Sequence, residues 1–142
     1  MERRWISESP AVWTAVKARI VGRAEPGTFD GRYAEATEGD LIPGEWWRVE
    51  EDGRTVGFGW LDVVWGDAEI LLATDPAHRR QGVGGFILEH LAAEARERGL
   101  CYFYNVIRAT HPDPEPVRAF LAKRGFAGSS DGRLLKAVTR DV

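Results

Sequence analysis

A glycine-rich turn between a strand pattern and a helix pattern constrains the fold of this chain more than any other feature. Residues 79–85 (RRQGVGG) separate the apolar run 70–73 from the amphipathic pattern that starts at Phe86. The glycines of this turn carry no Cβ, so another molecule can approach the backbone closely. The first N–H groups of a helix have no partner within the helix and lie at the positive end of its dipole. The turn therefore predicts a strand-to-helix connection that binds a phosphate or a pyrophosphate.

The spacing of the glycines excludes two well-known phosphate loops. A dinucleotide-binding loop has the pattern Gly-x-Gly-x-x-Gly and an acidic residue about 20 positions later, and residues 82–85 do not fit it. A nucleoside-triphosphate loop ends in Gly-Lys-Ser or Gly-Lys-Thr, and the chain contains neither. The pattern present is Arg79-x-x-Gly82-x-Gly84, which follows Pro76.

The patterns around this turn predict an α/β (α+β) fold. Asp-Gly at positions 52 and 53 lies between two β-rich runs and predicts a hairpin, and the run 68–74 adds a third antiparallel strand. Helical spacing over 84–98, followed by a strand over 102–107, implies a parallel crossover. The remaining expected elements are a helix over 9–21, a short helix over 117–124 and a C-terminal hairpin over 126–139. We expect a mixed, mostly antiparallel central sheet with one parallel crossover, flanked by helices, in a single domain of residues 1–142.

The motif and its surroundings resemble the acyl-coenzyme A signature of the GNAT superfamily of N-acetyltransferases. The resemblance lies in Arg79-x-x-Gly82-x-Gly84 and in the order of elements from Trp46 to the C-terminus, with residues 9–21 resembling the family's first helix. It implies the GNAT fold and an acetyl-CoA-dependent N-acyltransferase. Such an enzyme moves an acetyl group by direct transfer to a primary amine of a small molecule or peptide. The alternative is a non-catalytic acyl-CoA-binding sensor or regulatory module.

The resemblance also implies which residues bind acetyl-CoA. Backbone groups of the strand before the motif would pair with the pantetheine arm; they belong to Leu72, Ala73 and Thr74. Backbone N–H groups of the turn would hold the pyrophosphate beside the first arginine; the residues are Arg79, Arg80, Gln81, Gly82, Val83, Gly84 and Gly85. Asn105, on the strand after the helix, either bonds the cofactor amide or simply terminates its strand.

The groups that transfer protons stay open, because the family's usual general acid is missing. That acid is a tyrosine at the position of Leu121, and the usual asparagine at the start of the same helix is also absent. Glu69 is a candidate base, with pairing to a cation on the sheet surface as the alternative. His111 has an imidazole suited to proton transfer, but it also fits an ordinary surface loop. Tyr104 replaces the missing acid if its strand face lines the cleft, and is a packing residue if that face lines the core.

Charge and composition limit the kinds of partner and the cellular location that we expect for this chain. A net charge of −3 over 142 residues gives no general attraction to nucleic acid or to an anionic membrane. No apolar run approaches the roughly 18 residues of a membrane-spanning helix, and the N-terminus has no signal-peptide pattern, so we expect a cytoplasmic protein. The single cysteine, Cys101, excludes an intrachain disulfide and is expected as a small core residue. A homodimer remains one option for the assembly.

The tryptophans bear on which amine the protein would acetylate. Trp46 and Trp47 point to opposite faces of one strand, so at most one of them is expected to face the core. The tryptophans either pack the core or form an aromatic pocket for a cationic or planar amine. The nearby acids Asp62, Asp67 and Glu69 favour a cationic acceptor.

Overall fold

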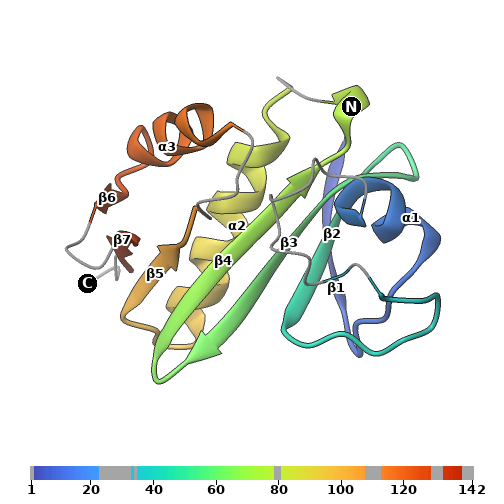
Figure 1. The fold of residues 1–142 in the computed structure, drawn as a ribbon, viewed down its shortest axis with the longest axis horizontal. Coiled ribbons are helices and arrows are strands. Elements are labelled where there is room, and N and C mark those ends of the chain that lie inside the picture. The colour runs from blue at the N-terminus through green and yellow to red at the C-terminus, as the bar shows by residue number, and fades with distance from the viewer. Residues whose placement is uncertain are drawn as a thin grey trace.

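A computed structural model describes residues 2–22, 33, 35–78, 81–107, 113–128 and 133–138. Within these ranges the chain forms one seven-stranded sheet in the order β1-β2-β3-β4-β5-β7-β6, with α2 on one face and α1 on the other (Figure 1). The strands are β1 (Arg3–Glu8), β2 (Glu45–Glu51), β3 (Arg54–Val64), β4 (Asp67–Thr74), β5 (Tyr102–Asn105), β6 (Ala127–Gly128) and β7 (Leu134–Ala137). The helices are α1 (Ala15–Lys17), its π-helical continuation η1 (Ala18–Gly22), the 3-10 turn η2 (Pro76–His78), α2 (Val83–Glu97) and α3 (Pro114–Ala122).

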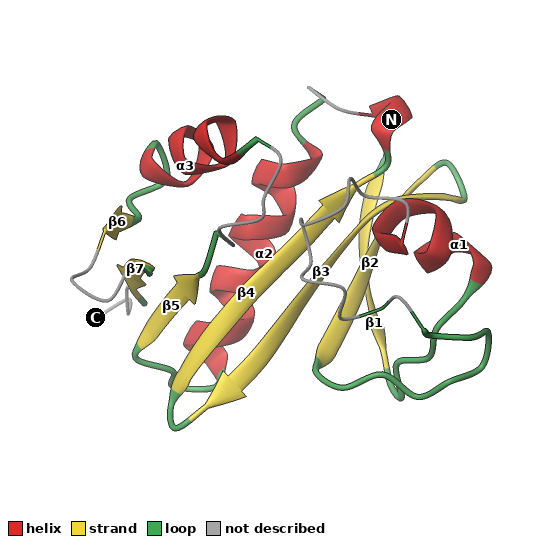
Figure 2. Cartoon of the chain, viewed as in Figure 1, coloured by secondary structure: helices red, strands yellow, loops and turns green. Residues whose placement is uncertain are grey.

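The sheet is antiparallel except for one pair of strands. β1 to β4 pair antiparallel in chain order, and β5 pairs in parallel with β4 after the α2 crossover (Figure 2). β7 pairs antiparallel with both β5 and β6. The expected mixed, mostly antiparallel sheet with one parallel crossover and flanking helices is therefore confirmed.

The two hairpins that join β2, β3 and β4 have turns in which both central residues have positive φ. Asp52 and Gly53 have φ of 52° and 78°, and Trp65 and Gly66 have φ of 52° and 87°. Such turns twist in the same sense as the strands that they join. Asp-Gly adopts this backbone readily, whereas a tryptophan in the left-handed region is uncommon.

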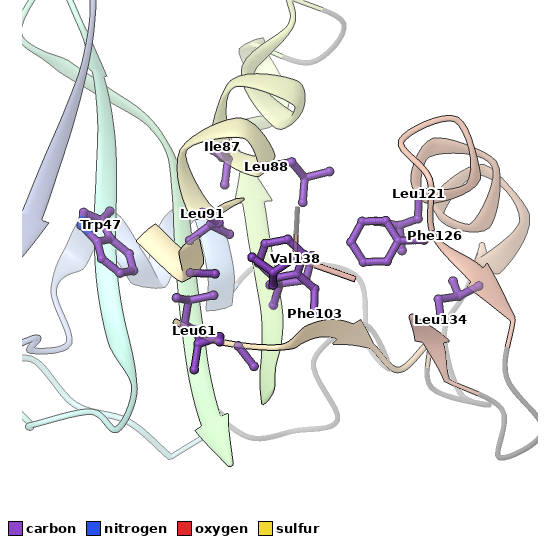
Figure 3. Close-up of a cluster of buried hydrophobic side chains, with 14 of the residues drawn as sticks. Trp47, Leu61, Ile87, Leu88, Leu91, Phe103, Leu121, Phe126, Leu134 and Val138 are labelled. Atoms are coloured by element: carbon purple, nitrogen blue, oxygen red, sulfur yellow. The ribbon is translucent and has the colours of Figure 1, made fainter. Parts of the chain in front are cut away.

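The sheet has a hydrophobic core on each face, which corrects the expectation for the two adjacent tryptophans. Trp47 faces α2 in a cluster with Ile87 and Leu91 (Figure 3). Trp46 stacks on Trp60 with ring centroids 4.0 Å apart, in a second cluster that includes side chains of η1. Trp46 is 1% exposed and Trp47 is 4% exposed. Both are buried because helical segments cover both faces of the sheet.

The N-terminal segment differs from the helix expected over residues 9–21. Residues 3–8 form β1, and the helix starts only at Ala15. Thr14 caps it, with its hydroxyl oxygen accepting a hydrogen bond from the Lys17 N–H at 3.2 Å. The six residues of β1, RRWISE, include only two apolar side chains, so their strand pattern is weak. Trp5 becomes a core residue through a long-range contact, a stack on Trp47 with centroids 5.5 Å apart.

Two smaller expectations are corrected as well. α3 begins at Pro114 rather than near residue 117, because proline suits the first turn of a helix. Cys101 is exposed instead of buried in the core, since it lies at the rim of the sheet, where its N–H donates to the Gly66 carbonyl oxygen at 2.8 Å. Among the helices in the described ranges, none is both long and apolar enough to cross a membrane.

Candidate active site

β4 and β5 pair over three residues and then diverge. Their parallel register ends at Glu69 and Tyr104. The next link is made by a side chain, because Asn105 Nδ2 donates to the Ile70 carbonyl oxygen at 2.9 Å. Beyond this point residues 71–74 pair with β3 on one side and, among the described residues, with no strand on the other. An extended, peptide-like group can add to an open strand edge of this kind.

The residues expected to meet a pantetheine arm lie on this open edge. They are Leu72, Ala73 and Thr74. Asn105 is the last residue of β5, and its side-chain amide is already engaged with Ile70. The position of Asn105 therefore fits the interpretation that it terminates its strand, and its side chain fixes the point where the two strands part.

The glycine turn leads from the end of β4 into α2. Gly82 immediately precedes the helix with φ of +80°, a conformation that glycine adopts without steric cost. Among the described residues no side chain caps this helix, so the first N–H groups, those of Val83, Gly84 and Gly85, have no intrahelical acceptor. Such N–H groups form an anion site. Two residues expected to add positive charge lie outside the described ranges, Arg79 and Arg80.

Arg3 of the edge strand β1 contacts the glycine turn and holds it in place; we call this contact the Arg3 brace. Its guanidinium donates to the Gln81 carbonyl oxygen and forms an ion pair with the buried Glu51. It also lies 3.4 Å from the position that a Cβ on Gly82 would take. Arg3 and Gln81 are 78 positions apart in the chain, so no local sequence pattern signals this contact.

Asp75 holds the 3-10 turn η2, which precedes the glycine turn. Its carboxylate accepts hydrogen bonds from Arg19 Nη1 at 2.5 Å and from the Ala77 N–H at 3.1 Å. Burial alone would raise the pKa of Asp75, but these hydrogen bonds outweigh it and lower the pKa below the usual value. The side chain of His78 is 18% exposed, with its Nδ1 3.7 Å from an Asp75 oxygen. Arg19 thus links η1 to the loop that precedes the glycine turn.

A row of polar side chains crosses the sheet where β4 and β5 part. Asp62 of β3, Glu69 of β4 and Tyr104 of β5 are neighbours in register. Glu69 is 7% exposed, so it lies buried between its neighbours rather than on an open sheet surface. Burial, followed by the charges of Glu69 and Asp62, raises the pKa of Tyr104, while Arg133 opposes the rise. The guanidinium of Arg133 lies 4.8 Å from the centre of the tyrosine ring. Tyr104 therefore keeps its phenolic proton at neutral pH.

α3 packs against the first turn of α2. A Cβ on Gly84 would lie 3.0 Å from Phe120 Cζ. Arg124 stacks on the same ring, 3.8 Å from its centre, and Arg124 Nη1 donates to the Phe120 carbonyl oxygen at 3.0 Å. Leu121, at the family's usual tyrosine position, is 1% exposed and packs in the core with Phe126 (Figure 3). Position 121 therefore supplies no proton donor.

The structure brings together two of the three candidate proton-transfer residues. Glu69 and Tyr104 form the last register pair before β4 and β5 diverge, at the closed end of what we call the fork of these two strands. His111 lies outside the described residues. The site thus has an open strand edge and unpaired helix amides at one end, and a carboxylate beside a protonated phenol at the other. This arrangement can hold a phosphate-bearing, peptide-like carrier and can exchange protons near its reactive end.

Comparison with known proteins agrees with this geometry. Residues 13–126 match the model of the acetyltransferase (GNAT) family. The chain belongs to the GNAT acetyltransferase family, because the match covers well over half of its length.

Three matches to individual proteins illustrate the similarity. The chain is 32% identical over 93 residues to the ribosomal protein bS18-alanine N-acetyltransferase of Escherichia coli strain K12. That match covers 61% of this chain, and the chain spans 63% of the relative's length. The crystal structure of the ribosomal-protein-S18-alanine N-acetyltransferase from Escherichia coli shares the fold, with a TM-score of 0.65, 18% identity and coverage of 99% and 97% of the two chains. A phosphinothricin acetyltransferase from Sinorhizobium meliloti in complex with AcCoA also shares it, with a TM-score of 0.56, 16% identity and coverage of 67% and 61%.

Proposed function

We propose that this protein is an acetyl-CoA-dependent N-acyltransferase that moves an acetyl group directly to a primary amine of a small molecule or peptide. The observation that carries the proposal is the fork of β4 and β5 beside the glycine turn. The fork offers an open strand edge to pantetheine, and the turn offers unpaired N–H groups to pyrophosphate. The names of the relatives support the proposal, since the Escherichia coli protein is an N-acetyltransferase and the Sinorhizobium meliloti protein is an acetyltransferase in complex with AcCoA.

The proposed donor site divides into two parts along the chain. The backbone of Leu72, Ala73 and Thr74 binds the pantetheine arm, and the Asn105 side chain shapes the end of the cleft. The pyrophosphate binds to backbone N–H groups of the turn, with positive charge from its two arginines; these residues are Arg79, Arg80, Gln81, Gly82, Val83, Gly84 and Gly85.

The proposed reaction forms one carbon–nitrogen bond, breaks one carbon–sulfur bond and moves two protons. The nitrogen of a neutral amine bonds to the thioester carbonyl carbon, and the bond from that carbon to sulfur then breaks. Glu69 accepts the proton that the amine loses, directly or through water, with His111 as the second candidate. Tyr104 donates a proton to the departing sulfur, which its raised pKa permits at neutral pH. A backbone N–H within residues 72–74 stabilises the negative charge on the carbonyl oxygen.

A non-catalytic acyl-CoA sensor is the second candidate, because Leu121 occupies a core position where the family has its usual tyrosine. Two measurements on the same sample separate the candidates. Calorimetry gives the affinity for acetyl-CoA, and a thiol assay follows coenzyme A release in the presence of a panel of amines and peptides. Binding with release supports the transferase, whereas tight binding without release for any amine supports the sensor.

We further propose that residues 1–142 form a single domain that acts in the cytoplasm. One continuous sheet joins the described strands from both ends of the chain. The name of the Escherichia coli relative concerns a ribosomal protein, which fits a cytoplasmic site of action. Single-transition unfolding and cell fractionation test the two statements.

A further inference from the structure

Exposed large apolar side chains gather at one end of the sheet. Among the described residues, the exposed large apolar side chains at this end are Val63, Val64, Trp65 and Tyr102. Leu41 is exposed elsewhere. Val64 and Tyr102 flank Asp67 in register, on the strands to either side of β4. We refer to Val64, Trp65, Asp67 and Tyr102 as the hairpin-tip surface.

Trp65 is costly at its position in the β3–β4 turn. It is 100% exposed, so the tryptophan gains no burial from the fold. Its φ of +52° lies in the left-handed region, which disfavours a bulky residue and suits asparagine or glycine. A tryptophan that strains its turn without burying its ring points to a role outside the folded chain.

The hairpin-tip surface continues the row of side chains that holds Glu69 and Tyr104. Side chains two positions apart on a strand share a face, so Asp67 lies beside Glu69 and Tyr102 lies beside Tyr104. At about 3.3 Å per residue, Asp67 is roughly 7 Å from Glu69 along the strand direction, and Trp65 lies just beyond Asp67 in the turn that precedes β4.

Charge indicates the chemistry of the occupant. Asp62, Asp67 and Glu69 lie close together on β3 and β4, and Arg133 stands beside Tyr104 at the inner end of this path. Glu69 is buried, so Asp62 and Asp67 supply the accessible negative charge. Together with the two exposed aromatic rings they complement arginine or lysine side chains interspersed with apolar ones.

We propose that the hairpin-tip surface binds the residues that follow the acetylated amine in a polypeptide acceptor with basic and apolar residues near its N-terminus. The inference rests on the proposed transferase function and narrows the acceptor to the N-terminal amine of a polypeptide. Trp65 and Tyr102 contact side chains near the second to fourth residues, and Asp62 and Asp67 attract their positive charges.

The test compares three acceptors with the full chain and its variants. One is a peptide with N-terminal alanine followed by arginine and leucine, one is the same peptide with glutamate for arginine, and one is alaninamide. The basic residue is arginine and not lysine, because a lysine side chain would give the peptide a second primary amine. Trp65→Asn suits the turn and should fold at least as well as the parent. Asp52→Asn places the same residue in the other positive-φ turn as a matched control.

We expect the parent protein to prefer the arginine peptide over the glutamate peptide. Trp65→Asn should raise the KM for the arginine peptide about fivefold to thirtyfold, because loss of an aromatic anchor has effects of this size at interfaces. It should leave kcat and the KM for alaninamide unchanged, and Asp52→Asn should leave all three acceptors unchanged. Asp67→Asn should reduce the preference for arginine over glutamate.

Three results would overturn the inference. They are unchanged peptide kinetics in Trp65→Asn, an equal loss for the peptide and alaninamide, and a shift of the sedimentation coefficient that marks the tip as a contact between copies. If no amine is acetylated at all, the proposed function fails independently. The inference is then tested by calorimetric binding of the arginine peptide to the protein loaded with coenzyme A: loss of binding in Trp65→Asn supports it, and equal binding contradicts it.

Discussion

The side-chain amide of Asn105 donates to the backbone carbonyl oxygen of Ile70 at 2.9 Å, at the point where β4 and β5 part. This bond takes the place of the ladder hydrogen bonds that end one residue earlier at Glu69 and Tyr104. It fixes the apex of the fork, and with it the position at which the open strand edge begins.

Asn105→Leu should therefore weaken both the fold and the donor site. The variant keeps most of the volume but leaves the Ile70 carbonyl without its side-chain donor, which costs about 1–3 kcal/mol of unfolding free energy if water does not replace it. Urea unfolding and an acetyl-CoA titration measure the two effects. Unchanged stability together with unchanged affinity would show that Asn105 does not hold the fork.

Arg3 should contribute to acetyl-CoA affinity from outside the motif. Arg3→Met removes the hydrogen bond to Gln81 and the ion pair with Glu51. The loss of one charge-assisted hydrogen bond that orders the turn should raise the Kd for acetyl-CoA about threefold to tenfold while the acceptor KM stays constant. Arg4→Met is the matched control, because Arg4 is the exposed neighbour on the same strand. An equal change of the Kd for acetyl-CoA in Arg3→Met and Arg4→Met would contradict the role of Arg3 in holding the glycine turn.

Gly84 should tolerate a methyl group only if Phe120 makes room. The Cβ of Gly84→Ala would lie 3.0 Å from Phe120 Cζ, so the ring must move from the first turn of α2. We expect lower stability and weaker acetyl-CoA binding in Gly84→Ala, and recovery when Phe120→Leu is added. A double-mutant cycle checks the coupling, and strictly additive effects would mean that the contact is not limiting.

Tyr104 should titrate above its usual pKa of 10.0, because burial and then the charge of Glu69 raise it. Glu69→Gln removes that charge and should bring the midpoint down. Since the pKa in the folded state is raised, the stabilising contribution of the phenol is complete below about pH 10 and is lost as pH rises through the folded value. Tyrosinate absorbance, with Tyr104→Phe subtracted, gives the midpoint.

The same tyrosine can be tested in catalysis. Tyr104→Phe should lower kcat about 10²-fold, a typical contribution of a general acid, with little change in acetyl-CoA affinity. A retained kcat would exclude Tyr104 as the proton donor and direct attention to His111.

Local patterns predicted the parts of this fold that local chemistry determines. The Asp52–Gly53 hairpin follows from turn chemistry, and α2 follows from its helical period and from Gly82 and Gly99 at its ends. Strand β1 could not be predicted in this way, because its pairing with β2 and the stack of Trp5 on Trp47 join segments far apart in the chain.

The candidate site also combines parts that a local sequence pattern predicts with parts that depend on long-range contacts. The glycine turn and the strand edge before it are continuous in sequence, so one motif indicates both. Arg3 and Phe120 reach the turn from distant elements, Arg19 reaches Asp75 in the loop before it, and no spacing rule connects these residues with the turn. Glu69 likewise meets Asp62 and Tyr104 only through the pairing of strands that are separate in the chain.

Calorimetric titration of acetyl-CoA into the parent protein and Gly84→Glu tests the central claim most directly. Gly128→Glu is the control, because a Cβ on Gly128 meets no heavy atom within 4 Å. We predict saturable one-to-one binding to the parent and to Gly128→Glu, and none to Gly84→Glu, whose carboxylate would stand at the N-terminus of α2 where the pyrophosphate binds. Equal affinity of Gly84→Glu and the parent, or no binding to the parent, would contradict the assignment of the glycine turn as the acetyl-CoA site.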